Sequence, residues 1–249
     1  MIIAIANQKG GVAKTTTAHN LSAALAVAGA TVLAIDLDSQ ASMTISMGKE
    51  PEDFDFTVCD ILKKNPDPIE KCIYELPAGY SLIPSIIDLA TLEMELMART
   101  ARETVLLRQL SKIKNNYDYI ILDCPPQLSI LTLNALAAAD RVLIPCKTDY
   151  LSYRGLEQLK LTIQDIKELV NPDIEILGVI ATFFEVISKD QKEILETMKS
   201  EYNVIGIIKK TVEAVKGVYD GMSVVERNPR SEIGQEYIKI AEYIKRSVS

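Results

Sequence analysis

The chain has 249 residues, of which 48% are hydrophobic and 24% are charged, and its net charge is −7 at pH 7. This composition excludes a disordered chain, and no apolar run reaches the ~18 residues that a membrane-spanning helix needs. The four cysteines are scattered and there is a single histidine, so we expect neither a zinc site nor a disulfide framework. We predict a cytoplasmic protein with reduced thiols.

Strand and helix patterns alternate along the chain. Short apolar runs predict strands at residues 2–6, 31–35, 80–84, 117–122, 141–145, 174–182 and 204–207. Helical spacing predicts helices at 15–29, 57–64, 88–114, 128–138, 152–170, 188–202 and 230–248. No linker or repeat interrupts the alternation. We therefore predict one α/β domain over residues 1–249, with a mostly parallel, twisted sheet and helices on both faces.

A glycine-rich loop follows the first predicted strand. It comprises Lys9, Gly10, Gly11, Val12, Ala13, Lys14, Thr15 and Thr16. The backbone N–H groups of such a loop bind phosphates, its lysine reaches the β- and γ-phosphates, and its hydroxyl binds Mg²⁺. We assign the last two roles to Lys14 and Thr15, which predicts a P-loop NTPase. Gln8 and Ala13 stand where the simple G-x-x-x-x-G-K-[ST] pattern has glycine, and we expect Ala13 to adopt a negative φ.

Carboxylates follow two other predicted strands. Asp36 and Asp38 come after the strand at 31–35, and Asp123 comes after the strand at 117–122. Ligands of parallel sheets bind beyond the carboxyl ends of the strands, and P-loop enzymes hold phosphate-bound Mg²⁺ there. Each feature alone also fits a helix cap or a turn. Together with the loop they predict a nucleotide and Mg²⁺ as ligands, with Thr15 and Asp123 at the metal. Asp36 is a further candidate metal ligand, although either Asp36 or Asp38 can turn toward the metal or the attacking water while the other packs.

Three stretches of the chain strongly resemble the ParA/Soj family of DNA-partition ATPases. They are residues 8–16, residues 36–40 and residues 122–126, and the first has the form of the family's deviant Walker A motif, K-G-G-x-x-K-[ST]. The similarity extends over nearly the whole chain and includes ILGVIATFF at 176–184 and NPRS at 228–231. The chain departs from many members at Arg154, where they carry Glu, and at 208–211, where they carry Pro-Arg-Asn.

The resemblance implies roles for the site residues. It implies an ATP-bound sandwich dimer in which Lys9 crosses the interface to the partner's nucleotide, whereas Lys14 acts within its own subunit. Asp38 is then the residue that orients the attacking water. The remaining implied roles are contacts to phosphate and metal: Thr16 at the α-phosphate, and Asp123 with Thr15 at Mg²⁺. Lys9, Lys14 and Asp38 are thus the candidate catalytic residues.

The resemblance also implies partners. They are non-specific DNA and a centromere-binding ParB-type protein that stimulates weak ATP hydrolysis, with the protein associated with the nucleoid while a plasmid or chromosome is segregated. Residues 205–249 hold eight basic and six acidic side chains, which fits either a DNA-binding rim or a solvated helix face. We name these candidate DNA contacts: Lys209, Lys210, Lys216, Arg227 and Arg230.

Three other functions remain open alternatives. A MinD-like ATPase needs an amphipathic C-terminal anchor, but residues 240–249 are short and mixed in charge, so we expect a core-docking helix and no stable membrane anchor. An iron–sulfur reductase needs paired cysteines, and we expect Cys124 to be a small buried residue. A non-hydrolysing nucleotide-binding scaffold is the third. We further expect His19 to be partly exposed, and the nucleobase to lie near Thr182 and Ile208.

Overall fold

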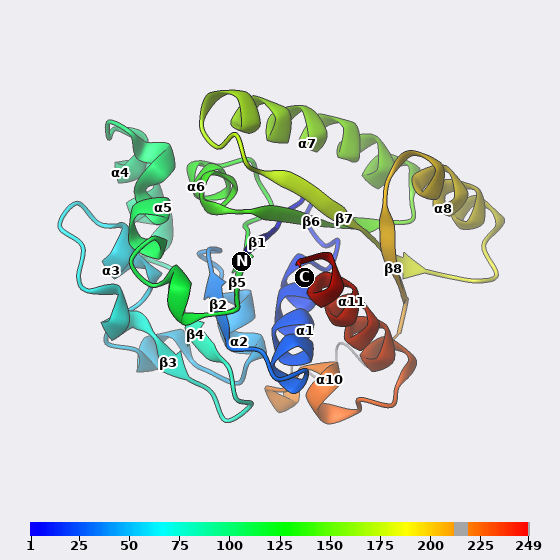
Figure 1. The fold of residues 1–249 in the computed structure, drawn as a ribbon, viewed down its shortest axis with the longest axis horizontal. Helices are drawn as coiled ribbons and strands as arrows, with labels where there is room; N and C mark the ends of the chain where they lie inside the picture. Colours follow the sequence, from blue (N-terminus) through cyan, green and yellow to red (C-terminus); the bar gives the residue numbers. More distant parts are fainter. Residues whose placement is uncertain (212–218, 249) are drawn as a thin grey trace.

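The computed structural model describes residues 1–211 and 219–248. Its strands form one eight-stranded sheet in the order β3-β4-β2-β5-β1-β6-β7-β8 (Figure 1). Every pairing is parallel except that of β3 with β4. The strands are β1 Ile2–Ile5, β2 Val32–Asp36, β3 Tyr74–Glu75, β4 Ser81–Ile83, β5 Tyr119–Asp123, β6 Arg141–Lys147, β7 Glu175–Phe184 and β8 Val204–Lys209.

Ten α-helices accompany these strands in the described residues, eight of them between strands and two, α10 and α11, after β8. They are α1 Lys14–Val27, α2 Ser42–Ser46, α3 Val58–Leu62, α4 Leu89–Met97, α5 Val105–Leu110, α6 Ile130–Ala138, α7 Tyr150–Leu169, α8 Lys189–Glu201, α10 Val224–Arg227 and α11 Glu232–Val248. Single turns of 3₁₀-helix lie at Pro51–Asp53, Ile69–Cys72, Arg102–Thr104 and Lys114–Asn116. The sequence patterns did not predict α2, α10 or β3, which are all five residues or shorter.

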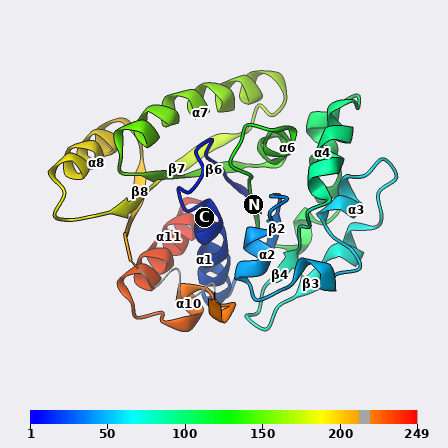
Figure 2. The same cartoon turned by 180° about the vertical axis from the view of Figure 1, so that it is seen from behind.

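The helices cover both faces of the sheet, as predicted. Ile3 and Ile5 point to one face and pack with residues of α1, α2, α10 and α11, whereas Ile2 and Ala4 point to the other face, toward α3 to α8. Figures 1 and 2 show the same two layers from opposite sides. Because successive residues of a strand alternate between faces, wholly apolar strands need both layers to bury their side chains.

The long helix predicted at 88–114 is wrong, because the chain forms α4 and α5 with a break between them. Ala101 lies in the break with φ +51°, which ends helical geometry. Asn134 of α6 supplies the partners that a continuous helix would supply, since its Oδ1 accepts from the Leu106 N–H at 3.0 Å and its Nδ2 donates to the Arg102 carbonyl at 2.8 Å. Both helices bury their apolar residues in the same core layer. The apolar spacing therefore continues from one helix to the next in the sequence and resembles that of a single long helix.

The C-terminal helix α11 docks on the core, as expected. Tyr237, Ile240 and Ile244 are fully buried on its inner face, and the Tyr237 hydroxyl lies 3.2 Å from the Thr17 hydroxyl of α1. Figure 1 shows α11 and α1 side by side. Over the described ranges, no helix combines the length and the apolar character that crossing a membrane requires.

Candidate functional site

A cavity of about 370 Å³ lies at the carboxyl edge of the sheet, beyond β1 and β2. The register pairs Asp123 with both Ile5 and Asp36, so the ends of β1, β2 and β5 meet there. The structure therefore brings together the residues predicted from three separate stretches. The cavity lining includes Gly10, Gly11, Ala13, Lys14, Thr15, Thr16 and Asp38, with Ser42, Pro126 and Phe183 beside them.

The glycine-rich loop is held in shape by side chains on both sides of it. Asn7 accepts from the Lys9 N–H at 2.9 Å and donates to the Pro145 carbonyl at 2.7 Å. Val12 is buried rather than facing the cavity, and its carbonyl accepts from the Thr182 hydroxyl at 3.1 Å. These contacts fix the loop to β6 and β7. Its N–H groups are thereby preorganised for an anion before one arrives.

The loop contains two left-handed residues, and one corrects a prediction. Gly11 has φ +67°, which glycine adopts without a steric penalty. Ala13 has φ +70° rather than the expected negative value. It is the residue that precedes α1, and its methyl group carries a cost of roughly 1–2 kcal/mol that glycine would avoid. The loop therefore keeps the geometry of a glycine position with an alanine in it.

Lys14 is buried at the mouth of α1. Only 7% of the residue is exposed, and its ammonium donates to the Lys9 carbonyl at 3.3 Å. Burial lowers the pKa of Lys14, and the nearby negative charges of Asp123 and Asp38 partly offset that effect. A buried ammonium that has lost its water has a strong attraction for an anion placed within the loop.

Asp123 is the most unusual group of the site. It is fully buried, and neither carboxylate oxygen accepts a hydrogen bond of ordinary geometry from the described residues, although the Thr15 hydroxyl lies close enough to act on its charge. Burial raises the pKa of Asp123 well above its usual value, as does the neighbouring Asp36, whereas the Thr15 hydroxyl and the Lys14 ammonium favour its charged form. An unpartnered buried carboxylate is costly. A cation that binds beside it removes that cost.

Asp36, by contrast, has both carboxylate oxygens hydrogen-bonded within the protein. One oxygen accepts from the Thr44 N–H at 2.9 Å and from the Thr44 hydroxyl at 2.8 Å, and the other accepts from the Asp38 N–H at 3.1 Å. Burial raises its pKa to about 6. These bonds tie the end of β2 to α2 and hold the backbone of Asp38 at the cavity.

The oxygen donors fit Mg²⁺ bound together with phosphate. No cluster of three or more His, Cys, Asp or Glu side chains capable of holding a metal occurs within residues 1–211 and 219–248. Mg²⁺, however, needs only one or two protein oxygens when phosphates and waters complete its octahedron. The Asp123 carboxylate and the Thr15 hydroxyl are such donors. A cation would offset the cost of burying the two Asp123 oxygens without hydrogen bonds of ordinary geometry.

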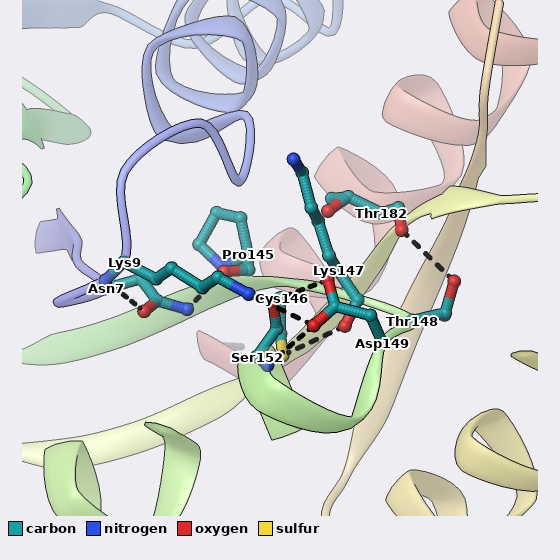
Figure 3. Close-up of polar contacts among 9 residues, drawn as sticks. All are labelled: Asn7, Lys9, Pro145, Cys146, Lys147, Thr148, Asp149, Ser152 and Thr182. Carbon is teal, nitrogen blue, oxygen red and sulfur yellow. Dashed lines mark hydrogen bonds and ion pairs between the residues drawn. The ribbon is translucent and has the colours of Figure 1, made fainter. Parts of the chain in front are cut away.

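Lys9 makes its contacts within its own chain. Its ammonium donates to Asp149 Oδ1 at 3.0 Å and to the Ser152 hydroxyl at 2.8 Å (Figure 3). Asp149 also caps α7, since it accepts from the Ser152 N–H at 2.8 Å. Burial raises the pKa of Asp149, but the bonds from Ser152 and Lys9 outweigh it and leave the pKa below its usual value. Sequence reasoning missed Asp149, because a helix cap gives no signal for a lysine 140 residues away.

A second cavity, also of about 370 Å³, adjoins the first. Thr182 and Ile208, the residues expected near a nucleobase, both line it. Ala13, Thr16 and Phe183 line both cavities, so the two are continuous around the loop. Its lining is mainly apolar, which suits a flat aromatic ring.

Most of the candidate DNA contacts are paired with acids. Lys209 pairs with Glu232, Lys210 with Glu185 at 2.7 Å, and Arg227 with Asp220 at 2.6 Å. Arg230 is exposed in the turn before α11, and Lys216 lies outside the described residues. Exposed ion pairs are weak, so these cations remain available to a polyanion that offers more charge.

His19 corrects another expectation, whereas Cys124 confirms one. His19 is buried rather than partly exposed, with 4% of its surface accessible. Its ring joins three helices, since Nδ1 lies 3.1 Å from the Ser46 hydroxyl of α2 and Nε2 lies 3.5 Å from Glu226 of α10. Cys124 is buried, as expected. Burial also raises the pKa of its thiol.

Comparison with known proteins gives consistent matches. The AAA domain family model matches residues 1–176. The sporulation initiation inhibitor protein Soj of Bacillus subtilis is 37% identical over 98% of this chain and 97% of its own. The chromosome partitioning protein ParA of Myxococcus xanthus is 40% identical over 81% of this chain and 71% of its own. A structure described as cobyrinic acid a,c-diamide synthase of Mycobacterium smegmatis, with bound ADP and magnesium, is 33% identical, with a TM-score of 0.84 over 99% of this chain and 94% of that one.

Proposed function

The chain belongs to the ParA/Soj family of DNA-partition ATPases, and from this premise we propose that it hydrolyses Mg²⁺–ATP to drive the segregation of a plasmid or chromosome. One observation carries the nucleotide part of this proposal. The buried Asp123 carboxylate lacks hydrogen bonds of ordinary geometry in the described chain and lies near the Lys14 ammonium and the Thr15 hydroxyl. This combination is suited to Mg²⁺ bound together with phosphate.

Phosphoryl transfer requires charge neutralisation and placement of the attacking water more than covalent chemistry. The loop N–H groups and Lys14 neutralise the phosphates. Thr15 and Asp123 would hold Mg²⁺, which would neutralise charge on the phosphates. Asp38 lines the same cavity and is partly exposed, so its carboxylate can hold a water in line with the terminal phosphate. Asp36 positions Asp38, because its hydrogen bonds with Thr44 and with the Asp38 N–H fix the loop that carries Asp38.

We place Lys9 at the interface of an ATP-bound homodimer. Lys9 bonds Asp149 and the Ser152 hydroxyl. The Lys9 side chain is 38% exposed and the Asp149 side chain is 42% exposed, so both solvent and a neighbouring subunit can reach this ion pair. In the dimer, Lys9 leaves Asp149 and reaches the nucleotide of the partner subunit. The intramolecular contact is then the resting state of the same residue.

DNA binding follows from the dimer. One subunit offers Lys209 and Lys210 at the end of β8, Arg227 at the end of α10 and Arg230 in the turn before α11. The ion pair of Lys209 with Glu232 joins the end of β8 to the start of α11. Two subunits double the phosphates that are neutralised, and each adds a slope of about −0.9 in log K against log salt. ATP binding thus turns DNA affinity on, and hydrolysis stimulated by a ParB-type centromere-binding partner turns it off. The protein is then nucleoid-associated within the cytoplasm.

A trapped variant tests the nucleotide and dimer parts. Asp38→Ala removes water placement but no phosphate contact, so we expect it to bind ATP, stay dimeric in sedimentation velocity and lose ATP hydrolysis. Asp190→Ala, which removes an exposed carboxylate from α8, is the matched control and should behave as wild type. An Asp38→Ala protein that stays monomeric with ATP contradicts the dimer, and a wild-type protein that binds no ATP contradicts the whole proposal.

A charge-reversal variant tests the DNA part. We expect Lys209→Glu/Lys210→Glu/Arg230→Glu to lose ATP-dependent DNA retention at low salt and to keep ATP-dependent dimerisation. The matched control reverses three exposed lysines of α7 and α8: Lys167, Lys189 and Lys192. Equal loss of DNA binding in both proteins indicates an effect of net charge alone. DNA retention by the first variant contradicts the assignment of this rim.

A further inference from the structure

Lys147, the last residue of β6, is a lysine for which the site described above has no role. It is half-buried and pairs in register with Thr182 of β7. Figure 3 shows its side chain extending away from Asp149 and toward the glycine-rich loop. Its ammonium lies 4.6 Å from the centre of the Phe183 ring and 3.9 Å from the place that a methyl group on Gly11 would occupy. Lys147 thus reaches the loop from the side of β6.

Among residues 1–211 and 219–248, no carboxylate neutralises the charge of Lys147. No ion pair of the described residues includes it, whereas Lys9 pairs with Asp149 and Lys210 pairs with Glu185 at the same edge of the sheet. The Phe183 ring attracts the ammonium through its negative face, which is weaker than a full opposite charge. A half-buried cation whose partner in the described chain is an aromatic ring keeps most of its attraction for an anion.

Phe183 holds this arrangement at a backbone cost. Its φ is +55°, a left-handed conformation that bulky residues rarely adopt. The conformation places the Phe183 ring under the Lys147 ammonium and on the lining of both cavities. Strained residues of this kind persist where the surrounding structure holds them for a purpose, and they concentrate at ligand sites.

We propose that Lys147 is a third cation for the nucleotide, which contacts the polyphosphate from the Gly10–Gly11 side of the loop while Lys14 contacts it from the side of α1. This inference rests on the proposed function, since it presupposes a nucleoside triphosphate in the loop. It adds a binding residue that lies 133 residues from Lys14 in the sequence and belongs to no nucleotide motif. The Phe183 ring keeps the ammonium in place before the nucleotide arrives.

The test compares nucleotides that differ in phosphate number. The variants are Lys147→Gln, Lys147→Met and Lys147→Arg, and Lys192→Gln on the exposed face of α8 is the control with the same charge change. Calorimetric titrations with Mg²⁺–ATP, Mg²⁺–ADP and adenosine give the dissociation constants. Thermal unfolding without nucleotide reports whether each variant keeps its fold.

A lost hydrogen bond to a charged group weakens binding by roughly 10- to 100-fold. We expect that loss for ATP and ADP with Lys147→Gln and Lys147→Met, an unchanged dissociation constant for adenosine, and recovery of most of the affinity with Lys147→Arg. Lys192→Gln should match wild type. If wild type binds ATP and Lys147→Gln binds it equally well, this inference is wrong and the proposed function stands. If adenosine binding falls as much as ATP binding, Lys147 supports the loop and contacts no phosphate.

Discussion

Releasing Lys9 from its own subunit should tighten the ATP-dependent dimer. The perturbation is Asp149→Asn, which removes the negative charge that faces the Lys9 ammonium at 3.0 Å. The amide oxygen of asparagine can still accept from the Ser152 N–H, which now bonds Asp149 at 2.8 Å, so the cap of α7 is retained. The change therefore acts on the ion pair and spares the helix.

The ion pair itself sets the size of the effect. The two side chains are 38% and 42% exposed, so water screens their attraction. A pair of this kind contributes about 0.2–1 kcal/mol. A dimer releases two copies of Lys9, so the variant gains roughly 0.4–2 kcal/mol in dimerisation, which is a dissociation constant about 2- to 30-fold lower than that of wild type.

Sedimentation velocity over a concentration series, with saturating ATP, measures this dissociation constant. Asp190→Asn on α8 is the control, because it removes one exposed carboxylate without touching Lys9. Thermal unfolding confirms that both variants remain folded. A dissociation constant for Asp149→Asn that equals or exceeds that of wild type, in a folded protein, would show that the contact of Lys9 with Asp149 does not compete with dimerisation.

The other predictions concern the loop and the buried carboxylates. Lys14→Ala should abolish ATP binding in calorimetry, because it removes the buried ammonium of the loop; unchanged affinity refutes the phosphate site. Ala13→Gly should raise the free energy of unfolding by up to ~1 kcal/mol, because relief of the strained φ of +70° exceeds the cost of the added entropy of the unfolded chain. Ala24→Gly, inside α1, should instead lower the free energy of unfolding by about 1 kcal/mol. Burial raises the pKa of Asp36 from 3.8 to about 6, so between these pH values the native state binds more protons than the unfolded chain and the free energy of unfolding falls as the pH rises. Urea titrations from pH 4 to 7 should show a smaller fall for Asp36→Asn, and an equal fall would assign the titration to another group.

Local sequence patterns predicted the glycine-rich loop and the acidic strand ends, although not the left-handed φ of Ala13. A strand, a glycine turn and a Lys-Thr pair that opens a helix encode their geometry within a dozen residues, because backbone conformation and helix start are local properties. The order of apolar strands likewise predicted a parallel sheet, whose carboxyl edge had to bring Asp36 and Asp123 together. These inferences needed only short-range patterns and one topological rule.

Other features were decided by contacts between distant segments. Asn134 of α6 stabilises the break between α4 and α5, which the uninterrupted apolar spacing concealed. The buried position of His19 depends on α2 and α10, which cover it from other parts of the chain. Periodicity reports which residues face the core, and it carries no information about where a helix is interrupted or what covers a polar side chain.

The sequence by itself determined which residues are candidates to bind phosphate and Mg²⁺, since that candidacy rests on the chemistry of the side chains and of the loop that carries them. Only the tertiary structure decided how the lysines are distributed around that loop. Lys14 is buried beneath it, Lys9 is held by Asp149, and Lys147 rests on Phe183 beside Gly11. The electrostatic environment of each ammonium depends on strands and helices that are remote in the chain and adjacent in space, so no local pattern could assign these three positions.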